Sequence, residues 1–531
     1  MAPAGRSIPV PITSPIKPSA EIRRVPSPPS NAVQGCSSGA CSSSTENWPI
    51  ERTTTPRFKL RFRFGVGAAI LAGALVRLFF IFKYPFESVD SFYYRQLANN
   101  WLYHHVYGLF INGQLIPADI RAPGYPAFLA AIAAVFGQSG LAIRLVQCSV
   151  DLGTCVMAGA LAAEIAPMHF RHRVFLIALW LAALCPFTAN YTAAILTETL
   201  ATFVTCAALL CLVRALRLTD QAPHTNEQMN NQQILPATAM WFGAGLLTGI
   251  GTLIRPETPI LMIPFGLLLL WRSWQSRQMK NFFLFTAWTA AGIVICLSPW
   301  ATRNAVTMGR VQFLAPRYAN SAGDYMPLGF YSWTQTWLVR YRDVYLFPWK
   351  LYGGRISPGD LPSSATDSPR ERATVVELLN EYNRVPQMTP SIDHQFARLA
   401  SERTRRNPLR TYVWVPSARV LSMWFTPRLE LLPVHCEFRP EKTVPWPRQT
   451  NFLFTSSLEL AAIVYIGLGL AGAWRRRCIS IAVALILFVV IRTLLMTQLQ
   501  TVEPRYVVLC FPVVIAFAAN AFTGWRTARI N

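Results

Sequence analysis

Charged side chains are scarce in this sequence. Only 14% of its 531 residues are Asp, Glu, Lys or Arg, whereas 52% are hydrophobic; a typical soluble protein carries about 25% charged residues. The shortage is uneven, because it comes from long apolar runs that are separated by short basic loops. This distribution excludes an ordinary soluble domain and predicts an integral membrane protein with several transmembrane segments.

Acidic residues are especially few, with 26 Asp and Glu against 49 Lys and Arg and a net charge of +23. A strongly basic chain could bind nucleic acid. Many of the Lys and Arg residues, however, lie directly beside hydrophobic segments, where the positive-inside rule places them on the cytoplasmic side of a membrane. We therefore interpret the charge as a sign of membrane topology and expect no nucleic acid among the partners.

The cysteine pattern of a disulfide-bonded or metal-binding domain is also missing. Cys436 is alone in the largest polar loop, which excludes a disulfide within that loop. Cys36 and Cys41 have no His or Cys partners nearby, so they do not predict a metal site. Most of the 11 cysteines lie in apolar runs, where we expect small core residues; these are Cys148, Cys155, Cys206, Cys211, Cys296 and Cys510.

The chain divides where its composition changes. Residues 1–57 are rich in Pro, Ser and Thr and have too few large apolar groups to offset the entropy of ordering, so we expect a disordered cytoplasmic tail. The basic residues Arg57, Lys59, Arg61 and Arg63 and the apolar stretch 64–82 predict a first span with a cytoplasmic N-terminus. Further hydrophobic stretches lie at 123–137, 141–166, 174–189, 192–214, 239–254, 258–272, 281–299, 453–474, 479–498 and 504–523.

The Lys and Arg clusters beside these stretches can all be cytoplasmic only if one early stretch does not cross. The stretch 123–137 is the shortest and begins with the helix-breaking sequence Ala-Pro-Gly-Tyr-Pro, so we assign it as a juxtamembrane or re-entrant helix. The sequence thus predicts an all-α polytopic membrane fold with about 10 transmembrane helices and an extracytoplasmic loop domain, partly helical, with an amphipathic stretch near 370–407. The predicted parts are the tail 1–57, an N-terminal transmembrane catalytic module 58–299 with a first extracytoplasmic loop 83–140, the loop domain 300–452, and a C-terminal transmembrane module 453–531.

Several polar residues stand at the predicted outer ends of the spans. Asp90 follows the first span, where a carboxylate could accept a proton from a hydroxyl group, and Tyr94 lies one helical turn further on to orient a substrate. For an isolated Asp, the N-cap of an interfacial helix is the simpler explanation. Arg121 stands at the start of the predicted re-entrant helix, where it could meet a phosphate or extend to lipid headgroups.

Two further groups lie at or inside predicted spans. Arg144, Gln147 and Asp151 recur at i, i+3 and i+7, so they share one helix face. A structural network between Arg144 and Asp151 is as plausible as a role in substrate binding, because ionised groups in a membrane face the interior of the bundle or a cavity. Glu198 opens a span near the outer face, where it could bind substrate, assist a base, hold a metal or cap the helix.

The remaining candidates are arginines at outer helix ends. Arg255 lies in a short turn between two spans, and Arg303 follows another span directly; both could contact headgroups, although basic residues are common at membrane edges. Arg505 precedes Tyr506 at the outer start of the last span, against the positive-inside trend. Arginine binds phosphate bidentately and stays charged, so Arg505 could neutralise a phosphate group; the alternative is a local salt bridge with Glu503.

In their order, these segments resemble the motifs of GT-C membrane glycosyltransferases, and most of all the protein mannosyltransferase and aminoarabinose transferase group. Asp90 with Tyr93–Ala98 resembles the acidic motif of the first loop, and Arg121–Ala130 resembles the Pro-rich motif that follows it. The same order continues through Arg144–Gln147, Leu196–Leu200, Leu253–Glu257, Pro299–Asn304 and Glu503–Tyr506. The similarity covers about residues 60–525, and the order and topology carry it more than any single motif.

The resemblance implies a GT-C-like fold and the inverting transfer of a hexose or pentose from a polyprenyl-phosphate carrier at the outer membrane face. The residue that matches Asp90 acts as the general base on the acceptor, and Arg505 helps to hold the phosphate. Several members have a pair of acidic residues at the first motif, whereas Ser88 and Val89 precede Asp90 here, so we expect metal independence and no cofactor, with a divalent metal left open. The predicted substrate-binding residues are Tyr94, Arg121, Arg144, Glu198, Arg255, Arg303, Arg505 and Tyr506.

The expected partners are a polyprenyl-phosphate sugar donor, membrane lipids and an acceptor that the sequence does not identify. The expected location is the bacterial inner (plasma) membrane, with the site on the periplasmic side. One alternative is a transporter or lipid flippase, which predicts inverted repeats and helices broken at mid-membrane; neither is clear here. Another is a non-catalytic scaffold of the same fold. Convergence of Asp90, Glu198 and Arg505 at one site would favour the transferase.

Overall fold

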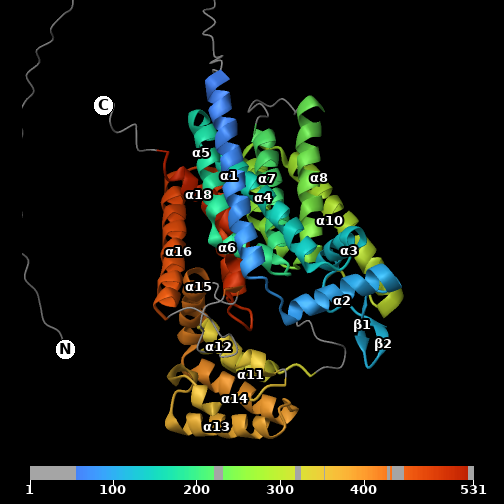
Figure 1. Ribbon diagram of the computed structural model, residues 1–531, viewed down its shortest axis with the longest axis vertical. Coiled ribbons are helices and arrows are strands. Elements are labelled where there is room, and N and C mark those ends of the chain that lie inside the picture. Colours follow the sequence, from blue (N-terminus) through green and yellow to red (C-terminus); the bar gives the residue numbers. More distant parts are fainter. Residues whose placement is uncertain are drawn as a thin grey trace, which may run out of the picture. The chain divides into compact units, whose positions relative to one another are not determined.

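The computed structural model describes residues 56–220, 231–316, 325–351, 353–426, 431–432 and 448–523, all within one compact unit. Nearly all of the predicted disordered tail, 1–57, lies outside the described residues, as do Cys36, Cys41 and Cys436. The unit is mostly helical. Within the described ranges it contains one β-sheet, a two-stranded hairpin (Figure 1). The predicted all-α class is therefore confirmed.

Six helices among the described residues are long and apolar enough to cross a membrane. They are α1 (Pro56–Lys83), α4 (Gly140–Glu164), α7 (Glu198–Asp220), α8 (Asn231–Ile254), α10 (Met279–Met308) and α16 (Arg448–Arg476). A seventh span would consist of α5 (Arg171–Leu184) and α6 (Pro186–Ala189), which belong to two segments that meet at 50°.

The predicted total of about ten spans is not confirmed. Helices α9 (Met262–Gln275), α17 (Ser480–Met496) and α18 (Phe511–Asn520) are shorter than the apolar stretches that predicted them. In two of the three, a proline near the start places the first residues in a 3-10 helix, which uses up part of the apolar stretch; these are η3 (Thr258–Leu261) and η9 (Pro504–Cys510).

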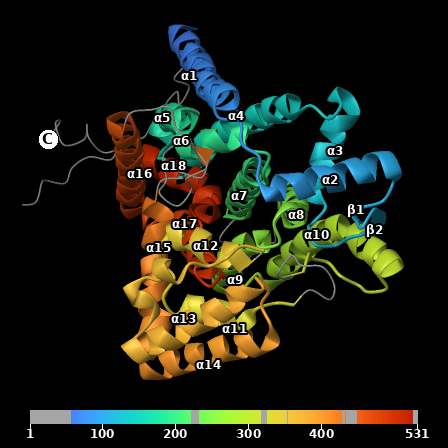
Figure 2. The ribbon, with the colours of Figure 1, turned by 60° about the horizontal axis from the view of Figure 1, so that its bottom comes forward.

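Helix α3 (Gly124–Phe136) has 13 residues. At 1.5 Å per residue it is about 20 Å long, less than the hydrocarbon thickness of about 30 Å, in agreement with a helix that does not cross. Its Pro-Gly start has a packing reason, because a Cβ on Gly124 would lie 2.7 Å from the carbonyl oxygen of Leu253 in α8. Helix α2 (Val89–His104) and the hairpin of β1 (Gly108–Ile111) and β2 (Gln114–Pro117) precede α3, and α2 packs beside it (Figure 2).

A buried ion pair joins α1 to α4. Arg77 lies 2.6 Å from Asp151, and both side chains are buried. The predicted network between Arg144 and Asp151 is therefore wrong. Arg144 turns instead to Glu87 at 3.0 Å and to the carbonyl oxygen of Ala193 at 2.9 Å. Asp151 pairs with Arg77 because α1 packs against α4 beside Asp151. This packing places Arg77, 74 residues earlier in the chain, next to the carboxylate.

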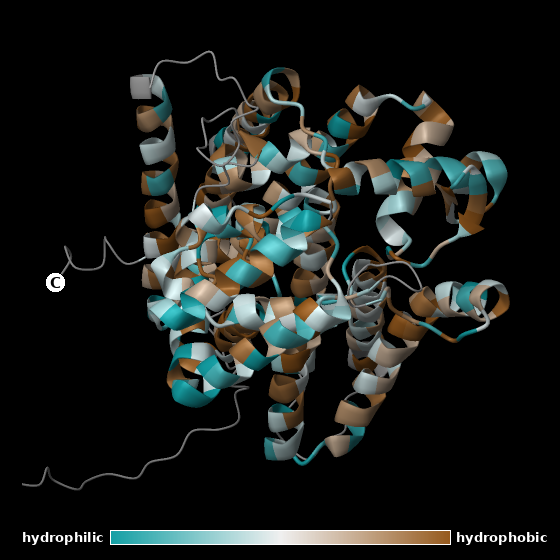
Figure 3. Cartoon of the chain, turned by 90° about the horizontal axis from the view of Figure 1, so that it is seen from below, coloured by the Kyte–Doolittle hydropathy of each residue, from teal (hydrophilic) through white to brown (hydrophobic). Residues whose placement is uncertain are grey.

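Beyond α10 the chain forms a helical cap, which consists of α11 (Leu328–Gln335), α12 (Tyr341–Leu346), α13 (Pro369–Arg384), α14 (Pro390–Arg406) and α15 (Val415–Phe425). Helices α13 and α14 coincide with the predicted amphipathic stretch, and α14 packs on α11 through Phe396 and Trp333. Seen from the cap side, these helices carry many hydrophilic residues (Figure 3). Helix α10 continues past the predicted boundary at residue 299 and ends at Met308, so its last residues lie beyond the apolar run.

The long helices end at two opposite faces. At one face, Glu164 at the end of α4 pairs with Arg214 at 3.3 Å, and Asp220 at the end of α7 pairs with Arg272 at 2.5 Å. Both arginines belong to clusters that were predicted to be cytoplasmic. The cap, α2 and the hairpin lie at the opposite ends of these helices (Figure 1). The outer-end motifs of the sequence are therefore gathered at one end of the bundle.

Candidate active site

The start of α2 leaves the Asp90 carboxylate free for other contacts. The N-cap is Ser88, whose hydroxyl accepts from the backbone N–H of Ser91, while the Ser91 hydroxyl accepts from the backbone N–H of Ser88. Ser91 also donates to the carbonyl oxygen of Ile195, which fastens α2 to the chain just before α7. The simpler explanation of Asp90 as an N-cap is therefore wrong, because Ser88 and Ser91 make this capping box.

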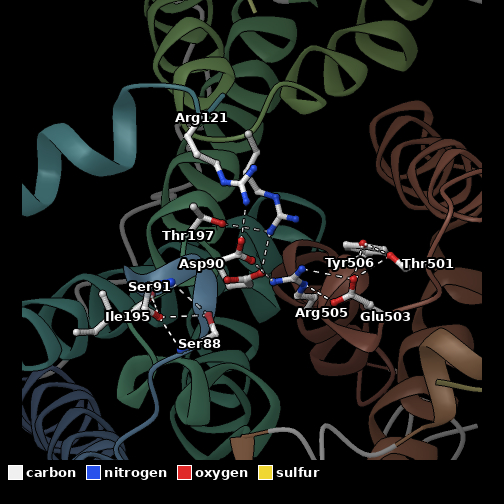
Figure 4. Close-up of polar contacts among 12 residues, drawn as sticks. Ser88, Asp90, Ser91, Arg121, Ile195, Thr197, Thr501, Glu503, Arg505 and Tyr506 are labelled. Atoms are coloured by element: carbon white, nitrogen blue, oxygen red, sulfur yellow. Dashed lines mark hydrogen bonds and ion pairs between the residues drawn. The ribbon is translucent and has the colours of Figure 1, made fainter. Parts of the chain in front are cut away.

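Asp90 bridges two arginines that come from distant parts of the sequence (Figure 4). Its Oδ1 accepts a hydrogen bond from Arg121 at 2.7 Å, and its Oδ2 accepts from Arg505 at 3.3 Å. Arg121 precedes α3, whereas Arg505 lies in η9, 415 residues after Asp90. All three side chains are partly exposed to solvent, between 20% and 28%.

The two guanidinium groups set the protonation state of Asp90. Burial alone would raise the pKa of this carboxyl, but Arg505 and Arg121 together hold the pKa below its ordinary value. Asp90 is therefore ionised at neutral pH, as a general base must be. Tyr94 has the opposite state, because burial and the nearby Asp90 charge raise the pKa of its hydroxyl to about 12, so it remains a neutral donor.

Arg505 is held in place by a second carboxylate. Its Nε lies 2.6 Å from Oε2 of Glu503, a side chain that is only 3% exposed. Glu503 also accepts hydrogen bonds from the hydroxyl groups of Tyr506 at 2.8 Å and Thr501 at 2.9 Å. From the sequence, the salt bridge to Glu503 is an alternative to a phosphate role for Arg505. In the structure this salt bridge leaves another edge of the guanidinium directed at Asp90 (Figure 4).

A second ionic cluster lies at the neighbouring ends of α7, α8 and α17. Arg255 contacts Glu198 at 3.1 Å and Glu257 at 2.8 Å, and Glu257 also pairs with Arg492 at 3.2 Å. Burial would raise the pKa of Glu257, but Arg255 and Arg492 lower it to about 2. Sequence reasoning missed Arg492; the signal was an arginine inside an otherwise apolar helix, which must find a partner.

Glu198 is the most deeply placed carboxylate of the site, at 1% exposure. One oxygen accepts from Arg255, whereas the other, Oε2, is buried and has no hydrogen-bond partner in the described part of the chain. Glu198 is near enough to interact electrostatically with Tyr94 and Arg505. Arg505 thus contacts Asp90 directly and interacts electrostatically with Glu198.

Tyr94 and Tyr506 line this site as well. The guanidinium of Arg121 lies 5.9 Å from the centre of the Tyr94 ring, and that of Arg505 lies 5.8 Å from the Tyr506 ring. Among the described residues, no three His, Cys, Asp or Glu side chains form a metal-binding group.

Two predicted site residues have other contacts. Arg303 donates to the backbone carbonyls of Tyr107 at 2.6 Å and Ala118 at 3.0 Å, and its guanidinium lies 5.2 Å from the Trp300 ring. It thereby fastens the ends of the hairpin to α10. Arg144 is paired with Glu87, as described above. Both contacts are ones that an arginine at a helix end makes for packing, and neither involves Asp90.

Part of the chain matches the model of a known protein family. Residues 90–302 match the model of the Alg9-like mannosyltransferase family. No curated protein matches the chain.

Two solved structures illustrate the overall similarity. The archaeal oligosaccharyltransferase AglB from Archaeoglobus fulgidus, solved with an inhibitory peptide and a dolichol-phosphate, is 15% identical at a TM-score of 0.46; the match covers 88% of this chain and 50% of that protein. ArnT from Cupriavidus metallidurans bound to undecaprenyl phosphate is 13% identical at a TM-score of 0.39, over 86% of this chain and 77% of ArnT. The chain spans about half the length of the oligosaccharyltransferase.

The family match covers the part of the chain that carries Asp90, Arg121, Glu198 and Arg255. The match is to a mannosyltransferase family and agrees with the resemblance to GT-C membrane glycosyltransferases that the sequence motifs indicated.

Proposed function

We propose that this protein transfers a sugar from a polyprenyl-phosphate donor to an acceptor at the extracytoplasmic face of a membrane, with Asp90 as the general base. The observation that carries the proposal is the meeting of Asp90 with Arg121 and Arg505. A base beside two phosphate-binding arginines is the arrangement that a reaction with a phosphate leaving group requires.

The side of the membrane follows from the distribution of charge. The site lies at the end of the bundle opposite the arginines Arg214 and Arg272, which the positive-inside rule assigns to the cytoplasm. We therefore propose that the site faces the periplasm or an equivalent compartment, and that the protein resides in a bacterial inner membrane. The cap, at the same end as the site, is the part that we expect to select the acceptor.

In the proposed step, a hydroxyl of the acceptor gives its proton to Asp90 while its oxygen attacks the anomeric carbon of the donor. The bond from that carbon to the phosphate oxygen breaks, and its electron pair leaves with the phosphate. Attack from the face opposite the phosphate inverts the anomeric centre. Arg505 and Arg121 stabilise the negative charge that develops on the leaving phosphate, a role for which arginine is suited because it stays charged and binds bidentately.

The name of the matching family supports a hexose, and mannose is the first sugar to assay. The experiment uses the full chain in vesicles with polyprenyl-phosphate mannose labelled in the sugar, together with a membrane extract as the source of acceptors. We expect label to enter an acceptor while polyprenyl phosphate is released.

Asp90→Asn should lower the rate at least about 100-fold, the usual contribution of a general base. Glu87→Gln, three residues earlier, changes the charge equally and should retain most of the activity. A variant at Asp90 that transfers sugar at the normal rate would refute the assignment of the base.

A further inference from the structure

We propose that Asp90 and the phosphate of the donor bind Arg121 and Arg505 in turn, so that donor binding displaces Asp90 and releases it to act as the base. This inference rests on the proposed function and adds the order of events at the same site. Asp90 contacts Arg121 at 2.7 Å and Arg505 at 3.3 Å, and these are the two arginines that we propose bind the donor phosphate.

The contacts of Arg505 indicate which of its two carboxylates gives way. Glu503 is 3% exposed, lies at 2.6 Å and is held by the hydroxyls of Tyr506 and Thr501. Asp90 is 28% exposed, lies at 3.3 Å and belongs to a different segment of the chain. An incoming anion therefore replaces Asp90, while Glu503 keeps the guanidinium in position.

Arg121 has hydrogen-bonding capacity that Asp90 does not use. One terminal nitrogen donates to Asp90, whereas its Nε is buried and has no partner in the described part of the chain. A guanidinium offers five N–H donors, and a phosphate offers more acceptor oxygens than the single carboxylate oxygen that Arg121 now contacts. Exchange of Asp90 for phosphate thus increases the number of charge-assisted hydrogen bonds that this arginine can make.

The exchange also changes the basicity of Asp90. The charged and titratable groups that face it are Arg121 and Arg505 from other segments and Tyr94 from its own helix. Once both arginines bind phosphate, burial is left unopposed and favours the protonated form. The released carboxylate then takes a proton more readily, and the acceptor hydroxyl supplies it. The base therefore becomes strong only when the donor is in place.

The test measures binding rather than transfer. The full-length protein in detergent is titrated calorimetrically with farnesyl phosphate, a water-soluble polyprenyl phosphate. We expect Asp90→Asn to bind the probe about tenfold more tightly than the unmodified protein, because the competing carboxylate is gone. Asp90→Ser provides the same test if the first variant does not fold.

Two further variants separate the possible explanations. Glu87→Gln, which removes the same charge beside α2 without a contact to Arg121 or Arg505, should change the affinity less than about twofold; equal tightening in both variants would mean that only net charge matters and would overturn the exchange. Unchanged or weaker binding by Asp90→Asn, with loss of binding in Arg505→Gln, overturns the exchange but leaves the phosphate site. Absence of binding in every variant overturns the proposed function as well.

Discussion

At the scale of single residues, the site depends on how each arginine is held. Arg505 has a short contact to the buried Glu503 and a longer one to Asp90. The first contact orients the guanidinium, and the second links it to the carboxylate that we propose as the base. Under the proposed function Glu503 is thus a positioning residue, because it would act on the donor phosphate through Arg505.

Glu503→Gln tests this role. Loss of the ion pair lets the guanidinium rotate, and a charge-assisted hydrogen bond of this kind contributes about 1.5–3 kcal/mol. We expect KM for the donor to rise about tenfold, which corresponds to about 1.4 kcal/mol, while kcat changes less than about threefold. Steady-state kinetics with varied donor measure both, and Glu377→Gln on the exposed face of α13 is the control. A fall in kcat alone would contradict a role in phosphate binding.

The pH dependence of transfer reports on Asp90. In the donor-free protein, Arg505 and Arg121 hold the pKa of Asp90 below the ordinary value, so the carboxylate stays ionised as the pH falls from 7 to 5 and kcat/KM should not be lost through Asp90 in that range. It is lost only when the pH falls through the lowered pKa. Arg121→Gln removes one of the two cations, so it raises the pKa of Asp90 and moves the acidic limb of the kcat/KM profile to higher pH. An acidic limb that stays in place or moves to lower pH would be inconsistent with this control of Asp90.

At the scale of elements, the site depends on how closely the start of α3 approaches the end of α8. Helix α3 begins at Gly124, where a Cβ would lie 2.7 Å from the carbonyl oxygen of Leu253 at the end of α8. This contact joins the segment of Arg121 to the segment of Arg255, two of the arginines of the site. A side chain at this position would push the two segments apart.

Gly124→Ala should therefore destabilise the protein by about 1–3 kcal/mol, the usual cost of inserting a methyl group into a packed contact. The temperature of unfolding of the detergent-solubilised protein measures the loss. Gly266→Ala in α9 is the matched control, because nothing lies within 4 Å of its added Cβ and the unfolded chain loses freedom. We expect no loss of stability there. Equal unfolding temperatures for both variants would show that the α3–α8 contact is not tight.

At the scale of the whole molecule, ion pairs join segments that are far apart in the chain. Asp90 with Arg505 and Glu257 with Arg492 connect the C-terminal helices to the first half of the sequence. The pair of Arg77 and Asp151 does the same for α1 and α4 in the interior of the bundle. These pairs fix how the helices meet and thereby where the outer-end motifs converge.

Arg77→Met should be among the most damaging single changes. It leaves Asp151 as an unpaired buried charge, which costs about 3–5 kcal/mol, whereas the double variant Arg77→Met/Asp151→Leu removes both charges and should regain most of that loss. Thermal unfolding and the yield of monodisperse protein measure both effects. Arg95→Gln, which breaks a partly exposed pair with Glu87, should cost less than about 1 kcal/mol. A double variant that is no more stable than Arg77→Met would show that the charge is not the cause.

The sequence by itself determined the class of the protein, the identity and order of the outer-end motifs, and most of the residues that meet at the site. These follow from local properties, since apolar runs, prolines and positive charges act over a few residues. It could not determine the partner of Asp151, the capping of α2 by Ser88 and Ser91, or the presence of Arg492 beside Glu257. Only the tertiary structure decided that Asp90 lies between Arg121 and Arg505, because helix packing, and not spacing along the chain, brings together side chains that are 31 and 415 residues apart.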